Sequence, residues 1–147
     1  MLVNSNSASA SEILAAALAD NNRAVIVGER SYGKGSVQKV LPLSNGVDHI
    51  KLTTEMWYTP KGKHINRNTD SQTDWGVSPS PELEVKLTPD EVRQFRLYIA
   101  SLDFVKGKSD PKREGIQKAL QKLDPNYKDK VMEKALEYLR KKLSEVE

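Results

Sequence analysis

The sequence contains no cysteine in its 147 residues. This absence excludes disulfide bonds, thiol nucleophiles and thiolate metal sites, and it is compatible with both the cytoplasm and the cell envelope. Long apolar stretches are also absent. The most apolar run, ILAAALA at residues 13–19, is too short to span a membrane and has polar residues on both sides. We therefore interpret it as part of a buried helix.

A strong excess of one charge is missing as well. The net charge is +3, and basic residues alternate with acidic ones instead of forming a stripe interleaved with aromatic residues, so we expect no nucleic-acid partner. The sequence has no His-Glu-x-x-His motif and no carboxylate cluster, so we expect no metal and no cofactor. With 37% hydrophobic and 29% charged residues, the chain fits one globular domain or one piece of a larger domain.

The first part of the chain predicts a helix next to a parallel strand. Leu2-Val3 is apolar and fits the end of a strand, and Ser9 and Glu12 match the S-x-x-E capping box at a helix start. RAVIVGE, at residues 23–29, is rich in β-branched residues and predicts a buried strand. A helix followed by a buried strand indicates an α/β unit with a parallel strand.

A β-hairpin is predicted next. Residues 36–43 and 47–60 are rich in β-branched and aromatic residues and are separated by Ser44-Asn45-Gly46, which favours a hairpin turn. ELEVKL, at residues 82–87, predicts one more strand. The expected fold class is therefore α/β (α+β), with a helix packed on a mixed sheet, a β-hairpin and then C-terminal helices.

From residue 88 onward the sequence predicts helices. Residues 88–91, TPDE, form a capping box with proline at the first helical position. The following apolar residues recur at helical spacing on one face, namely Val92, Phe95, Ile99 and Leu102. Amphipathic helices are also expected within residues 113–123 and 129–143, after a hinge at residues 106–112. We interpret this region as a helical cap rather than as a dimerisation arm, because charged outer faces are typical of surface helices.

The loop GERSYGKGSVQ, at residues 28–38, has the G-x-x-x-x-G-K spacing of a phosphate-binding loop. Such a loop opens a helix, and its lysine is followed by serine or threonine. Here Gly35 follows Lys34, and the next residues predict a strand, so we reject nucleotide binding. A solvated lysine is the common alternative, yet Gly33 and Gly35 would allow the backbone to turn the amine inward.

Ser9 stands where a nucleophile is well placed. At a helix N-terminus the backbone amides favour negative charge. A Ser-His-Asp triad with Asp20 or Asp48 is disfavoured, because His49 falls in a predicted strand, His64 falls in a lysine-rich turn, and nothing places either near Ser9. Asp20 lies about three helical turns beyond Ser9, so we expect it to support the C-terminal end of the helix.

Three runs together resemble the carboxyl-terminal processing peptidases, also called tail-specific proteases. They are NSASASEILAAALAD at residues 6–20, RAVIVGERSYGKGSVQ at 23–38 and LTTEMWYTPKGK at 52–63, with a weaker similarity at WGVSP, residues 75–79. Asn6 departs from the pattern, where glycine is more usual. The resemblance implies a serine protease core with a Ser-Lys dyad in place of Ser-His-Asp. It also implies that unstructured C-terminal regions of proteins are recognised through a PDZ domain.

By position, the resemblance implies that Ser9 is the nucleophile, Lys34 the general base and Gln38 the residue that orients the lysine. The backbone N–H of Ala10 is the implied donor to the oxyanion. A free lysine has a pKa of about 10.4, so only about one molecule in 2,500 carries a neutral amine at pH 7, and burial must lower this pKa. Gln38 lies an even step beyond Lys34 on a predicted strand, which places both side chains on one face.

The resemblance further implies parts that these residues do not contain, namely the upstream half of the protease core, with a second oxyanion donor, and the PDZ domain. Residues 1–87 are then the catalytic half and residues 88–147 a helical C-terminal region. Alone, the chain is expected to be a very weak protease, with Lys34 solvated and with uncovered apolar surface that drives homo-oligomer formation. The alternative is a non-catalytic fragment that serves only in assembly or binding. The resemblance suggests the cell envelope or periplasm.

Overall fold

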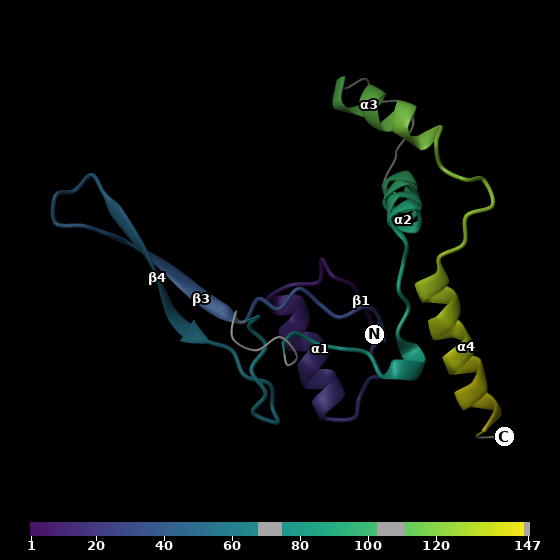
Figure 1. The fold of residues 1–147 in the computed structure, drawn as a ribbon, viewed down its shortest axis with the longest axis horizontal. Helices are drawn as coiled ribbons and strands as arrows, with labels where there is room; N and C mark the ends of the chain where they lie inside the picture. Colours follow the sequence, from purple (N-terminus) through teal and green to yellow (C-terminus); the bar gives the residue numbers. More distant parts are fainter. Residues whose placement is uncertain (68–74, 103–110, 146–147) are drawn as a thin grey trace. The chain divides into compact units, whose positions relative to one another are not determined.

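The computed structural model describes residues 1–67, 75–102 and 111–145. These residues form two compact units, Met1–Val85 and Lys86–Glu147, each with its own set of elements (Figure 1). The first unit has a mixed α+β composition, and the helices of the second confirm the expectation of C-terminal helices. No helix in the described ranges is both long and apolar enough to cross a membrane.

A short parallel strand pair and one helix organise the first unit. Strand β1 (Leu2–Val3) pairs in parallel with β2 (Val27–Gly28), and helix α1 (Ala10–Asp20) connects them. The predicted parallel strand is thus confirmed, although the regular pairing covers only two residues of the expected run. The helix contributes small residues to the core, which lets the backbones approach closely. The buried core residues are Val3, Ala15, Ala16, Ile26, Ile65 and Val77.

The predicted hairpin is confirmed. Strand β3 (Ser36–Pro42) pairs antiparallel with β4 (His49–Met56), and the ribbon extends away from α1 (Figure 1). The Asn45 side chain closes the turn, since its Oδ1 accepts the N–H groups of Val47 at 3.1 Å and Asp48 at 3.0 Å. A β-bulge interrupts the pairing between Val37 and Gln38.

The prediction of a strand at residues 82–87 is wrong. Residues Pro81–Leu83 form a 3-10 helix, η1, and only one bridge joins the following Glu84 to Gly28, with the Val85 N–H donating to the Gly28 carbonyl at 2.8 Å. The fixed φ of Pro81 favours the start of a helical turn. Because β2 is only two residues long, it offers too short an edge for the apolar alternation of ELEVKL to form a ladder.

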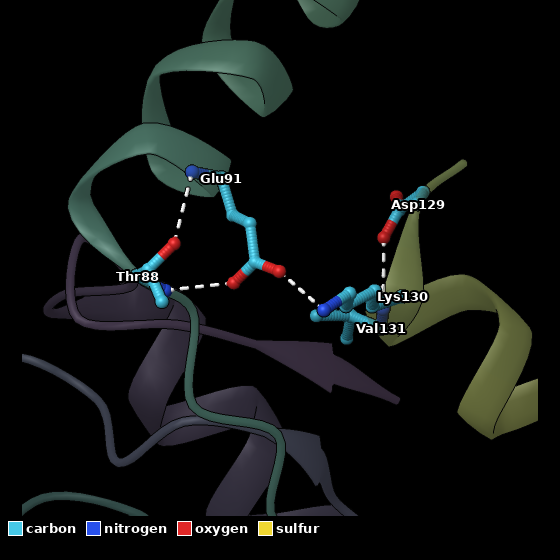
Figure 2. A network of polar contacts seen from close by, with 5 residues as sticks. All are labelled: Thr88, Glu91, Asp129, Lys130 and Val131. Atoms are coloured by element: carbon cyan, nitrogen blue, oxygen red, sulfur yellow. Dashed lines mark hydrogen bonds and ion pairs between the residues drawn. The ribbon is translucent and has the colours of Figure 1, made fainter. Parts of the chain in front are cut away.

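The second unit consists of helices α2 (Pro89–Leu102), α3 (Pro111–Leu120) and α4 (Lys130–Ser144). No residue of α2 or α4 is buried, and on the predicted apolar face of α2 the exposed fraction reaches 63% at Leu102. The capping box predicted at the start of α2 is confirmed by the reciprocal bonds between Thr88 and Glu91 (Figure 2). Most of the predicted hinge, residues 106–110, lies outside the described residues.

Candidate active site

Ser9 occupies the N-cap of α1 in a strained backbone conformation. Its φ of 56° and ψ of −117° are unusual for a residue with a side chain. The S-x-x-E capping box is confirmed, because the Ser9 N–H donates to Glu12 Oε2 at 2.8 Å. Ala10 is the first helical residue, and its N–H is among the groups that have no helical acceptor at a helix start. The beginning of α1 therefore offers a serine beside amides that favour negative charge.

The loop that carries Lys34 depends on two glycines for close packing. A Cβ on Gly33, whose φ is +86°, would lie 2.8 Å from Trp75 Cε3, and a Cβ on Gly35 would lie 2.5 Å from the backbone nitrogen of Asn66. Both glycines are buried, whereas Lys34 between them is exposed. The expectation that the glycines turn the amine inward is therefore not met in this chain. They serve instead to bring the backbone against residues 66–67 and Trp75.

Two contacts tie the lysine loop to the serine loop. The Tyr32 N–H donates to the Ser7 carbonyl at 2.9 Å. The Lys34 N–H donates to Glu12 Oε2 at 2.8 Å, and the same oxygen accepts the Ser9 N–H at 2.8 Å. One carboxylate oxygen therefore brings together the backbones of the two residues that the sequence singles out.

Glu12 is the centre of this arrangement. Its side chain is fully buried, with 0% exposure, and its second oxygen, Oε1, accepts the Gly33 N–H at 2.6 Å and the Ser31 hydroxyl at 2.5 Å. Because all four partners are donors, they suit a carboxylate, which only accepts. Sequence reasoning assigned Glu12 to capping alone. The signal for burial was its position three and four residues before Ala15 and Ala16, which places all three on one helix face.

The WGVSP segment, the weaker of the family similarities, joins the same network. The Ser31 N–H donates to the Val77 carbonyl at 2.9 Å, and the Val77 N–H donates to the Ser31 hydroxyl oxygen at 2.7 Å. Gly76 adopts φ +63°, and a Cβ there would lie 2.8 Å from Ser31 Oγ. Segments that are far apart in the sequence thus converge on Ser31 and Glu12.

Gln38 lies on β3 directly after the bulge and is exposed. The even-step argument that placed it on the face of Lys34 is wrong in its premise, because β3 begins only at Ser36 and the bulge at Val37 breaks the alternation of side chains. The orienting role of Gln38 remains a prediction.

Asp20 makes the contacts expected of a structural residue. Hydrogen bonding from the Thr59 side chain, together with the Lys61 N–H at 3.0 Å, holds the pKa of Asp20 below its ordinary value. The carboxylate thus ties the end of α1 to the turn at residues 59–63. The ring of His64 contacts that of Tyr58 in a tilted arrangement, with the ring centroids 5.2 Å apart, and His49 begins β4. Within the described ranges, neither imidazole forms a hydrogen bond with Ser9.

The first part of the chain matches a known family of peptidases. The model of the family described as Peptidase family S41 matches residues 1–81, and the chain belongs to this family. The carboxy-terminal-processing protease of Bartonella bacilliformis is 35% identical over 130 residues, which cover 85% of this chain and 27% of that protein. The chloroplastic C-terminal processing peptidase of Tetradesmus obliquus is 41% identical over 92 residues, covering 63% of this chain and 18% of that protein.

A solved structure titled as a photosystem II D1 C-terminal processing protease aligns with 58% of this chain and 19% of its own, at 42% identity and a TM-score of 0.48. The chain therefore spans about a quarter or less of the length of the proteins that it matches here. The named relatives include bacterial and chloroplastic processing proteases.

Proposed function

We propose that residues 1–81 supply the nucleophile and the general base of a Ser-Lys endopeptidase that cleaves unstructured C-terminal regions of proteins. In this proposal Ser9 is the nucleophile, Lys34 the base, Gln38 its orienting partner and the Ala10 N–H an oxyanion donor. The observation that carries it is the shared Glu12 Oε2, which accepts from the N–H groups of both Ser9 and Lys34 at 2.8 Å. The names of the relatives support the substrate class, since they describe processing at a carboxyl terminus.

The proposed reaction has two halves. Ser9 Oγ attacks the scissile carbonyl carbon while the neutral Lys34 amine takes the hydroxyl proton, and the oxyanion that forms accepts a hydrogen bond from the Ala10 N–H. The lysine then gives its proton to the leaving amine, and an ester with Ser9 remains. A water molecule, deprotonated by the same amine, hydrolyses this ester and restores the serine.

The exposure of Lys34 bears on how much activity this chain has by itself. A lysine amine surrounded by water is a poor general base, so the proposed base needs a surface that covers it and excludes water. The relatives contain much more chain than is present here, and we propose that such additional chain provides this cover. The same exposure favours the second candidate function, a non-catalytic piece used in assembly.

The test is cleavage of a fluorogenic peptide with an unstructured C-terminus, by the chain alone and with an upstream protease half from the Bartonella bacilliformis relative added as a separate polypeptide. Ser9→Ala and Lys34→Ala should abolish cleavage, and Lys34→Arg should be equally inactive because a guanidinium does not lose its proton. Ser7→Ala and Ser11→Ala are matched controls that should keep most activity. Full cleavage by Ser9→Ala would overturn the proposal, and no cleavage by the mixture would favour the non-catalytic alternative.

A further inference from the structure

We propose that Glu12 is a positioning residue that holds the backbone of Ser9 against the backbone of Lys34. The inference rests on the proposed function, because it gives a catalytic purpose to a contact between these two residues. Glu12 acts through them and not on the substrate, since its side chain is fully buried and both oxygens are occupied by groups of the chain itself.

The two carboxylate oxygens have separate tasks. Oε2 accepts the N–H groups of Ser9 and Lys34, each at 2.8 Å, and so sets where the two loops stand relative to each other. Oε1 accepts the Gly33 N–H and the Ser31 hydroxyl, at 2.6 Å and 2.5 Å, and so fixes the shape of the lysine loop. Hydrogen bonds to an ionised acceptor are shorter and about twice as strong as neutral ones, which suits a positioning task.

The strained conformation of Ser9 gives this contact a second purpose. A residue with a side chain at φ 56° persists only where its surroundings hold it. The bond from the Ser9 N–H to Glu12 Oε2 is one such restraint, and it acts on the residue whose hydroxyl orientation matters most to the proposed reaction. A residue that only stabilised α1 would not need to reach 22 positions along the chain to Lys34.

Two substitutions of Glu12 distinguish the roles of its two carboxylate oxygens. Glu12→Ala removes every acceptor, so the N–H groups of Ser9, Gly33 and Lys34 all lose their partner. Glu12→Gln keeps one oxygen and replaces the other by a donor NH2. The Ser31 hydroxyl can accept from this NH2 but a backbone N–H cannot, so the remaining oxygen should face Ser9 and Lys34. Of the three backbone amides, only that of Gly33 should then lose its acceptor. Glu12→Gln is therefore expected to keep the hydrogen bonds of the Ser9 and Lys34 N–H groups that Glu12→Ala removes.

The experiment is 15N NMR of the full chain, recording amide proton shifts and hydrogen exchange at Ser9, Gly33 and Lys34. In Glu12→Ala we expect upfield shifts and roughly tenfold or faster exchange at all three amides, and in Glu12→Gln at Gly33 alone. Ala16→Gly is the matched control, because it destabilises the same helix from a buried position and leaves the Glu12 carboxylate in place. It should leave the shifts of the three amides as in the wild type.

Peptide cleavage by the mixture with the upstream half gives the catalytic readout. We expect kcat to fall at least about tenfold in Glu12→Ala with KM little changed, and to recover in part in Glu12→Gln. Unchanged Ser9 and Lys34 amides in a folded Glu12→Ala would overturn the inference, and so would an unchanged Gly33 amide in Glu12→Gln if the alanine variant fails to fold. Cleavage that survives Ser9→Ala would overturn the proposed function instead, and the amide shifts would still decide the role of Glu12.

Discussion

The chain contains two capping-box glutamates that share one local motif and have opposite surroundings. Glu12 follows Ser9 at the start of α1, and Glu91 follows Thr88 at the start of α2, each accepting the N–H of the capping residue at 2.8 Å. The Glu12 side chain is fully buried, whereas that of Glu91 is 26% exposed. Figure 2 shows that the second oxygen of Glu91 meets the Lys130 side chain at the start of α4.

The difference between the two glutamates shows what the local motif determines and what it does not. The S/T-x-x-E pattern fixes one oxygen of each carboxylate on the helix start. The tertiary structure determines the partner of the other oxygen. In Glu12 this partner is a buried backbone loop of the first unit, and in Glu91 it is a lysine at the surface of the second. A buried carboxylate tolerates no missing donor, while an exposed one can replace a lost partner with water.

The largest expected effect comes from matched alanine substitutions of the two glutamates, which test the comparison directly. Glu12→Ala should lower the free energy of unfolding of the first unit by about 3 kcal/mol or more, because several buried donors lose their acceptor. Glu91→Ala should cost only a small fraction of that loss, since solvent replaces its partners. Urea unfolding of Glu12→Ala is followed by tryptophan fluorescence, which reports on the first unit because Trp57 and Trp75 are the only tryptophans of the sequence. Unfolding of Glu91→Ala is followed by far-UV circular dichroism, which reports on the helices of the second unit. Equal losses for the two variants would contradict the comparison.

Glycine substitutions test the same contrast between closely packed residues of the first unit and exposed residues of the second. Gly76→Ala should destabilise the first unit by about 2–4 kcal/mol, because φ is +63° and the new Cβ would lie 2.8 Å from Ser31 Oγ. Gly115 in α3 has no atom within 4 Å of the Cβ position, so Gly115→Ala should stabilise its helix by about 0.5–1 kcal/mol. Urea unfolding followed by far-UV circular dichroism measures both changes.

Gly46→Ala is the control for backbone strain by itself, since Gly46 has φ +69° and open space around its Cβ position. It should cost about 1–2 kcal/mol. If Gly76→Ala costs no more than Gly46→Ala, the close contact with Ser31 contributes nothing.

Local signals in the sequence predicted the elements that local interactions determine. The two capping boxes, the bounds of α1 and the hairpin with its Asn45 turn all follow from residues within a few positions of one another. The strand expected at residues 82–87 failed because a strand needs an edge to pair with, and β2 ends after two residues. No local pattern describes the length of a partner strand.

For the candidate site, the sequence singled out residues but not the contacts that join them. Ser9 and Lys34 stand out through their motifs, yet the side chain that joins their backbones belongs to Glu12, which forms bonds to residues 19 to 22 positions away. Such bonds depend on how the loop returns to the helix. The exposure of Lys34 agrees with the expectation for the chain alone. The bulge before Gln38 escaped prediction, because it depends on backbone packing against residues 57 and 66 rather than on the loop's own sequence.

The smallest expected effect concerns pH and Glu91. The hydrogen bond from Lys130, followed by that from the Thr88 N–H, lowers the pKa of Glu91 from 4.5 to about 2. Since the pKa in the folded state is the lower one, the contribution of Glu91 to stability is fully present above about pH 4.5 and is lost as the pH falls toward about 2. Because the pair is solvated and screened by salt, the change in stability should be slight, but the titration midpoint should be clear.

This midpoint can be measured by following the Glu91 side-chain carboxyl carbon by NMR as the pH is lowered. Lys130→Ala removes the largest cause of the shift, so the pKa of Glu91 should rise toward its ordinary value. Lys134→Ala is the matched control, because it removes a lysine of the same helix that pairs with Glu137 and not with Glu91. A wild-type midpoint near 4.5 would mean that Glu91 does not hold Lys130 in solution. The second oxygen of this capping box would then have no fixed partner, which would widen the contrast with Glu12.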